Sequence, residues 1–199
     1  RASLTWLDRS GGSRLFKRFP GDEFERILAL ESVGDGQVLV MGYRHIPAGD
    51  KRSRATGHAM LMGSNGVVER DFYIGEPGTK IMAGQVLPDG HIILSGSTLN
   101  KEGREAGFVC KVSPRNKVVY FYTAVTGAVC RHFDVLGNRS ELLHAAFTDG
   151  KGGSSVVRLD ENGKPYFLTT LPDESYRIER MVSTADGDIY LVGQGEKAG

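Results

Sequence analysis

Basic side chains are the residues of this sequence whose types and spacing best suggest a binding function. One segment, residues 44–54, combines four cations and a histidine with a single carboxylate, Asp50. Such a segment could hold an anionic glycan or the acidic surface of a protein, although a run of charge is also typical of a solvated loop. The candidate ligand-binding residues of this segment are Arg44, His45, Lys51, Arg52 and Arg54.

The histidines and cysteines have no spacing that is typical of a metal centre or a catalytic nucleophile. The five histidines are His45, His58, His91, His132 and His144, and they form no H-x-x-x-H pair. Cys110 and Cys130 align with apolar residues of the repeat described below, so we expect both in the core. We therefore predict no catalytic residues, no metal site and no cofactor.

Composition excludes several classes of partner. The formal charge is +1, which argues against a nucleic-acid ligand. No run of about 18 apolar residues is present, so we expect no membrane insertion. The chain begins at Arg1, which is typical of a processed or excised product. Glycine is the outlier, because 27 of 199 residues are glycine, about twice the usual share.

Many of these glycines belong to a repeat of about fifty residues. Residues 33–42, 87–96 and 184–193 share an Asp-Gly pair, an apolar run and a closing glycine. Residues 136–145 are a degenerate copy, with Asn138 for the aspartate and Ala145 for the closing glycine. A second hairpin pattern recurs between these segments, at 59–68, 109–120 and 156–167, with a looser copy at 6–16. Asp-Gly or Asn-Gly between apolar runs indicates a hairpin, so each unit holds four strands.

Four strands in about fifty residues is the period of a propeller blade. We predict an all-β chain that forms a single β-propeller domain over residues 1–199, with four four-stranded blades. Blades 1 to 3 cover 24–75, 79–122 and 128–170. Blade 4 combines an outer hairpin at 1–19 with an inner hairpin at 177–195, and the pairing of these hairpins would close the ring. The alternative is a fragment or half of a larger propeller, completed by a second chain.

The repeat resembles the glycine-rich bacterial β-propeller repeat of the DGG…G and KLDxNG type. The matching residues are Asp89-Gly90 through Gly96 and the segment Arg158-Leu159-Asp160-Glu161-Asn162-Gly163. The sequence departs from this pattern at Arg158, where the family has lysine, and at Gly63, which replaces the aspartate in blade 1. The resemblance implies a binding or display scaffold of a secreted or surface protein, and hence an extracytoplasmic location.

The candidate functional face is the end of the predicted propeller where strand two connects to strand three and one blade connects to the next. We expect its loops at 43–57, 97–107 and 147–153, with shorter ones at 73–78, 123–128 and 172–176. Three blades also place a cation just before the first apolar residue of the innermost strand: Arg26, Lys80 and Arg177. These cations could bind a carboxylate or phosphate at the mouth of the channel. Alternatively, they pair with the nearby Glu25, Glu174 and Glu179.

Three functions are consistent with this pattern. The first is a non-catalytic propeller that presents variable loops to a protein or glycan ligand. The second is an enzyme that acts on a sugar or lactone with a metal in the central channel, using residues such as His58, Glu76 or His144. The third is architectural, with the chain acting as half of a larger ring. The chain would accordingly be a monomer, or a dimer that completes such a ring.

Overall fold

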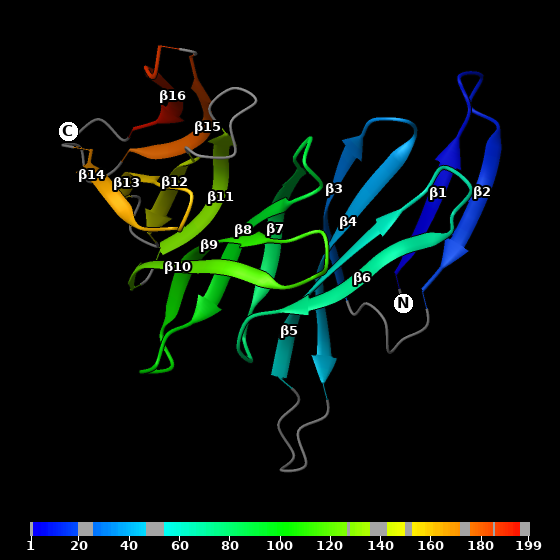
Figure 1. Cartoon of the computed structure of the whole chain (residues 1–199), viewed down its shortest axis with the longest axis horizontal. Helices are drawn as coiled ribbons and strands as arrows, with labels where there is room; N and C mark the ends of the chain where they lie inside the picture. The colour runs from blue at the N-terminus through cyan, green and yellow to red at the C-terminus, as the bar shows by residue number, and fades with distance from the viewer. Residues whose placement is uncertain are drawn as a thin grey trace. The chain divides into compact units, whose positions relative to one another are not determined.

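The chain folds into antiparallel β-sheets (Figure 1). The computed structural model describes residues 2–19, 26–46, 54–126, 128–135, 143–149, 153–171, 176–184 and 186–195. These residues contain strands, turns and bends and no helix, which confirms the all-β prediction. Accordingly, no helix of the described chain could cross a membrane.

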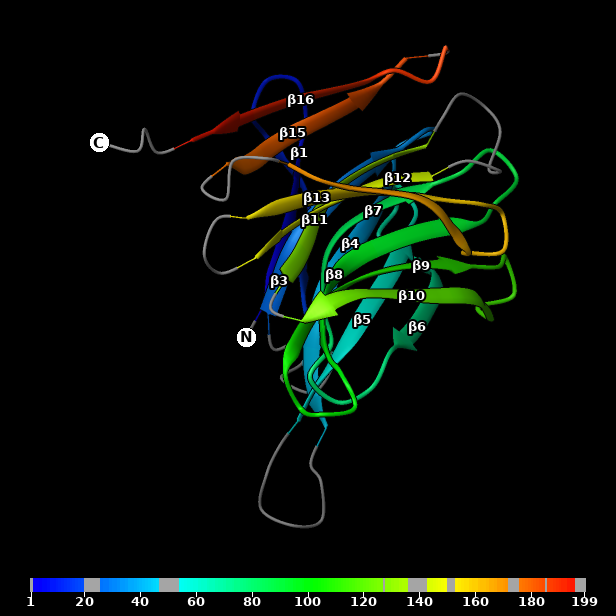
Figure 2. The same ribbon diagram turned by 90° about the vertical axis from the view of Figure 1, so that its left-hand side faces the viewer.

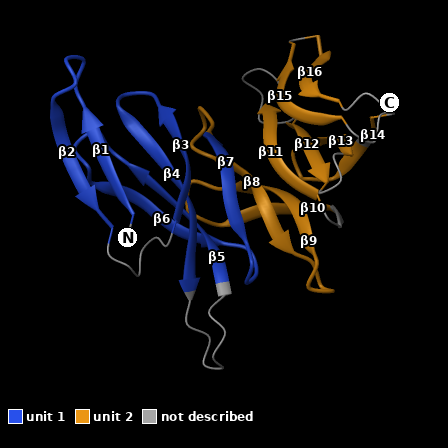
Figure 3. Cartoon of the chain, turned by 180° about the vertical axis from the view of Figure 1, so that it is seen from behind, with its two compact units in different colours: residues 1–85 blue, residues 86–199 orange. Residues whose placement is uncertain are grey.

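The chain divides into two compact units, residues 1–85 and 86–199 (Figure 3). Unit 1 begins with a two-stranded hairpin of β1 (Ser3–Leu7) and β2 (Ser13–Arg18). A four-stranded sheet follows, in the order β3-β4-β5-β6. Its strands are β3 (Arg26–Val33), β4 (Gln37–Ile46), β5 (Arg54–Met62) and β6 (Val68–Ile74). The next strand, β7 (Lys80–Val86), lies at the division between the units.

Unit 2 contains the remaining strands. One sheet has the order β10-β9-β8-β7, with β8 (Ile92–Leu99), β9 (Glu105–Val112) and β10 (Val118–Thr126). The next has the order β11-β12-β13-β14, with β11 (Ala128–Val135), β12 (Leu143–Asp149), β13 (Ser154–Leu159) and β14 (Pro165–Thr170). A final hairpin joins β15 (Arg177–Ser183) to β16 (Ile189–Gln194). Figures 1 and 2 both show β15 lying against β11 and β12.

The first strands of three sheets carry an irregularity at the same place. The pairing of β3 with β4 shifts between Ile27 and Ala29, and that of β15 with β16 shifts between Ile178 and Arg180. The closing glycine lies beside each shift, where a Cβ at Gly42 or Gly193 would overlap a backbone carbonyl oxygen of the partner strand. The glycine is therefore needed for close approach of the two backbones.

The third sheet has the same shift, between Cys130 and His132, but a different partner opposite it. Phe147 pairs with Cys130, whereas Ala145 pairs with Phe133. The prediction that Ala145 replaces the closing glycine is therefore wrong by two residues. The physical reason is the connection that lacks an Asp-Gly pair, since its two extra residues displace β12 along β11.

Each unit has its own apolar core. In unit 1, Leu4 and Trp6 of the first hairpin pack against Val40 and Met60 of the neighbouring sheet. In unit 2, Phe147 packs with Val109 and Cys130 on one face of β12. The opposite face packs against the C-terminal hairpin, where Ala146 lies in one cluster with Ile178, Met181 and partly buried Leu191. Cys110 and Cys130 are both free and fully buried, as predicted.

Several connections expected as loops are strand at their described ends. β8 continues to Leu99 and β9 starts at Glu105, so the predicted loop at 97–107 is a tight turn, with Asn100 N donating to Arg104 O at 2.8 Å. Similarly, β4 extends to Ile46 and β12 to Asp149. Small and β-branched residues such as Ser97 and Thr98 continue the cross-strand pairing, which shortens the connection.

The two terminal hairpins are each a two-stranded sheet. The described strands thus include three four-stranded antiparallel sheets and two half-sheets, and they form no closed sheet. The strand order within each four-stranded sheet follows the chain, as in a meander.

Candidate functional site: an arginine-lined cavity in unit 2

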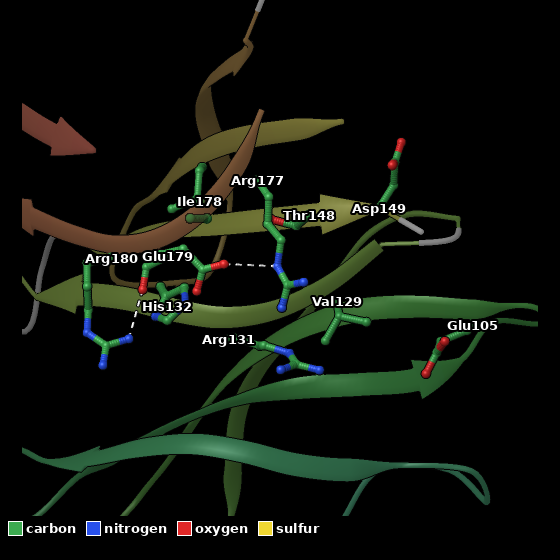
Figure 4. Close-up of a pocket in the computed structure, with 11 residues that line it drawn as sticks. Glu105, Val129, Arg131, His132, Thr148, Asp149, Arg177, Ile178, Glu179 and Arg180 are labelled. Carbon is green, nitrogen blue, oxygen red and sulfur yellow. Dashed lines mark hydrogen bonds and ion pairs between the residues drawn. The ribbon is translucent and has the colours of Figure 1, made fainter. Parts of the chain in front are cut away.

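A cavity of about 470 Å³ opens at one end of the sheets of unit 2 (Figure 4). Its lining comes from the start of β9, β11 and β15 and from the end of β12. This is the end of the strands that the sequence predicts as the functional face. Eleven of the described residues line the cavity: Glu105, Val129, Arg131, His132, Ala146, Thr148, Asp149, Arg177, Ile178, Glu179 and Arg180. Three of them are arginines, which come from two different strands.

The irregularities in β11 and β15 determine which side chains reach this cavity. The pairing of β11 skips Arg131, and that of β15 skips Glu179, so each is the extra residue of a β-bulge. A bulge turns a side chain away from its regular alternation, and it is a common way to direct a residue into a site. Cys130 and Ile178 remain in the core on one side of these bulges.

The cations of β15 are already engaged with their own strand. Arg177 Nε lies 3.2 Å from Glu179 Oε1, and Arg180 Nη1 donates to the backbone oxygen of Glu179 at 2.8 Å. Figure 4 shows the Arg177 guanidinium extending from β15 toward the space above Arg131. The exposed side chain of Arg131 makes no hydrogen bond or ion pair with the described residues, and neither does that of Glu105. Arg131 and Glu105 are thus available to a ligand.

The pKa of His132 depends on the charges that line this cavity. Burial lowers the pKa of its imidazole below the ordinary value, and the charges of Arg180, Arg131 and Arg177 lower it further. Glu179 acts in the opposite direction but does not reverse the shift. The arginines therefore outweigh the nearby carboxylate at this position, and the histidine is neutral at pH 7.

Among the predicted ligand-binding residues that the structure describes, Arg177 alone lies in this cavity. Arg177 lines it, as the predicted cation at the start of the innermost strand. Arg26 and Lys80 begin β3 and β7 in unit 1. Glu179, one of the predicted alternative partners of these cations, does pair with Arg177.

The basic segment at 44–54 is partly strand. Arg44 and His45 belong to β4, opposite Thr56 and Ala55, and Arg54 begins β5. Lys51 and Arg52 lie outside the described residues. The prediction of one continuous loop is therefore wrong at both of its ends, where cross-strand pairing extends the hairpin.

Arg44 takes part in a chain of side chains in unit 1. Its Nη1 lies 2.8 Å from the hydroxyl of Tyr73, and its guanidinium lies over the Tyr73 ring. The other neighbour of Tyr73 is the buried His58, whose ring stacks on it at 4.5 Å. His58 Nε2 in turn lies 2.6 Å from Asp71 Oδ1. These contacts join three strands of the first four-stranded sheet and give Arg44 a structural role.

His144, a candidate for catalysis from sequence, is the centre of a polar network in unit 2. Its Nε2 accepts a hydrogen bond from Arg158 Nε, and its Nδ1 lies 2.6 Å from Ser183 Oγ. Because arginine only donates, the neutral ring carries its proton on Nδ1 and donates it to Ser183. In this tautomer His144 does not accept the serine proton, so the pair is not arranged as a base and a nucleophile.

Sequence reasoning missed most of the cavity. Arg131 and Arg180 lie one and two positions after the aligned residues Cys130 and Ile178, whereas the predicted cations lie one position before them. The repeat shows that these neighbours are basic, but not that bulges bring them to one cavity. Glu105 lies in the segment 97–107 that the sequence places on the functional face, but nothing in its residue type or spacing distinguishes it there.

Among the described residues, no group of three or more histidine, cysteine or acidic side chains is arranged to hold a metal ion. A comparison with models of protein families finds no match, and a search of curated proteins finds no similar sequence.

Proposed function

We propose that this chain is a non-catalytic binding scaffold of the β-propeller type, which holds an acidic group of a protein or glycan in the arginine-lined cavity of unit 2. The observation that carries the ligand part of the proposal is the convergence of Arg131, Arg177 and Arg180 from two strands on one cavity. Guanidinium groups match carboxylate, sulfate and phosphate oxygens through paired N–H donors.

The propeller part of the proposal rests on the two terminal hairpins. The covered face of the C-terminal hairpin includes Met181 and Leu191, and its other face exposes Tyr190 and Val192. The N-terminal hairpin likewise has one covered face and exposes Leu7. A complete propeller blade has a neighbour on each face. Two half-blades, each covered on one face, are what an unclosed ring would contain.

The repeat also supplies a register in which the hairpins fit. Met41 pairs with Ala59 in the first four-stranded sheet. Val192, like Met41, directly precedes the closing glycine of its strand. Leu4, like Ala59, lies seven residues before the turn glycine of its hairpin, which is Gly11 in one case and Gly66 in the other. This register places the exposed Val192 on the same face as Leu4, which packs in the core of unit 1. β16 and β1 would then both lose an unpaired edge, which is otherwise prone to association.

Sedimentation distinguishes a four-bladed ring closed within one chain from a larger ring built from two chains. A ring closed within one chain predicts a monomer of 21.6 kDa at all concentrations. A dimer would show instead that the edges pair between two chains, as in half of a larger propeller.

Binding to acidic and neutral polymers tests the ligand part. We expect the immobilised chain to retain an acidic polysaccharide or acidic peptide and not its neutral counterpart. The double substitution R131A/R177A should abolish retention. R9A/R14A removes the same charge from two exposed arginines of unit 1 and is the matched control. Equal loss in both variants would mean that only net charge matters, which would refute a specific site.

A further inference from the structure

The available groups of the cavity differ from those of a simple anion site. The lining contains three carboxylates besides the three arginines. Glu179 pairs with Arg177, and Asp149 Oδ1 accepts a hydrogen bond from the backbone N–H of Gly153 at 2.9 Å, whereas Glu105 makes no hydrogen bond or ion pair with the described residues. The hydroxyl of Thr148, also in the lining, lies 3.0 Å from Ser154 Oγ. Arg131 and Glu105 line the same cavity without forming an ion pair with each other. A bare oxoanion would satisfy Arg131 and be repelled by Glu105.

An apolar side chain separates these charges. Val129 of β11 is half-buried and lines the cavity with them. Figure 4 shows Val129 between Arg131 and Glu105. A ligand that contacts both charged ends must therefore pass an apolar surface between them.

The charge of the ligand follows from the cations of the lining. A zwitterion would place an ammonium group against Glu105 in a cavity that Arg131, Arg177 and Arg180 already line, and these like charges would oppose it. Uncharged hydroxyl groups avoid this cost and still donate hydrogen bonds to a carboxylate. The best match is thus a ligand with one carboxylate, several hydroxyls and an apolar C–H face.

We infer that the cavity binds an acidic sugar of the uronic-acid type. This inference rests on the proposed anion-binding function and specifies its ligand. Arg131 holds the sugar carboxylate, with the free N–H groups of Arg177 and Arg180 beside it. Glu105 accepts hydrogen bonds from ring hydroxyls, and the C–H face of the pyranose lies on Val129. A volume of about 470 Å³ lies in the usual range of small-ligand pockets.

Calorimetric titration of the intact chain with three small probes tests this assignment. We expect glucuronate to bind at least about tenfold more tightly than glucose, which lacks the carboxylate, or acetate, which lacks the hydroxyls. Equal affinity for glucuronate and acetate would overturn the sugar assignment and leave the anion-binding scaffold intact. If glucuronate, acetate and the acidic polymers all fail to bind, the proposed function fails as well.

Two substitutions separate the roles of the charged residues. R131A should weaken glucuronate and acetate alike, by about tenfold or more, because both lose the paired N–H donors. E105Q should weaken glucuronate and leave acetate unchanged or slightly tighter, because acetate has no hydroxyl to donate and no longer meets a like charge. R14A is the matched exposed control, and unchanged circular dichroism verifies folding. Equal effects of E105Q on both probes would contradict the assigned role of Glu105.

Discussion

The second strand of a four-stranded sheet and the second strand of the C-terminal hairpin have the same sequence pattern in different surroundings. Residues 33–42 and 184–193 both contain Asp-Gly, an apolar run and a closing glycine. In β4, the consecutive residues Leu39, Val40 and Met41 are all buried. In β16, by contrast, Tyr190 and Val192 are 63% and 65% exposed, although Leu191 between them is partly buried. The repeat encodes a strand with two apolar faces, and the hairpin covers only one of them.

The largest loss of stability should come from a residue that is buried on an inner strand of a four-stranded sheet. Phe147 is buried in the core of unit 2, so F147A should lower the free energy of unfolding by about 3–5 kcal/mol. Leu168, on the outermost strand of the same sheet, is exposed, and L168A should cost less than about 1 kcal/mol. Urea unfolding measures both, and similar losses would contradict the burial that separates them.

Substitution of the closing glycine tests the close approach of the two backbones that the β3–β4 and β15–β16 pairs share. G193A should cost about 2–3 kcal/mol, because the new Cβ meets the backbone oxygen of Arg177, which cannot move without disturbing the strand pairing. G42A should behave alike against Arg26. Gly34 has open space at this position, so G34A is the control and should be nearly neutral. A neutral G193A would show that the hairpin does not hold this register.

Acid should loosen the attachment of the C-terminal hairpin. Burial and the nearby Arg158 lower the pKa of His144 to about 4, whereas Asp134 opposes the shift. An ordinary histidine titrates near 6.5, so the native state gains stability above that pH and loses it as the pH falls toward 4. We expect the free energy of unfolding to decrease by roughly 1–3 kcal/mol over this range.

The contacts of His144 explain why the hairpin is affected. Ser183 of β15 is held by His144 and also donates its backbone N–H to Asp134 Oδ2 at 2.5 Å. H144N should be less stable at pH 7 and should have a flatter pH profile between 6.5 and 4. An unchanged profile in H144N would assign the acid sensitivity to other groups.

The smallest expected change in stability tests whether a closed ring covers the face of the C-terminal hairpin that carries Val192. If the ring closes as proposed, V192A should cost about 1–2 kcal/mol, as for a buried valine. The control is Val119, which is exposed on the outermost strand of its sheet, and V119A should change the unfolding free energy by less than 0.5 kcal/mol, roughly. Equal, negligible effects would mean that the face of Val192 stays in water.

Sequence could predict the hairpins because their turns depend on local chemistry. Gly36, Gly90 and Gly187, the glycines of the three Asp-Gly pairs in the repeat, all have the positive φ that a tight turn needs. The buried positions of Cys110 and Cys130 also follow from the repeat, since an apolar alignment predicts a core residue. These features depend on a few neighbouring residues or on the period alone.

The candidate site could not be predicted in the same way. Arg131 reaches the cavity because of a bulge, and nothing in its own residue type marks one. The displaced register of β12 follows from two extra residues in a connection, which changes the partner of Ala145 without changing its character. The expected loops are shorter than predicted, because cross-strand pairs within them, such as Thr98 with Ala106, extend the hairpins.

Cross-linking of β16 to β1 tests the proposed ring most directly. In the register given by the repeat, Leu4 and Val192 lie opposite each other, which places their Cβ atoms within disulfide distance. The variant L4C/V192C should therefore form a disulfide within one chain on mild oxidation, whereas S3C/V192C, which combines opposite faces, should not. The buried Cys110 and Cys130 should remain unreacted. A cross-link that forms only between chains, or none at all, would contradict closure of the four blades within one chain.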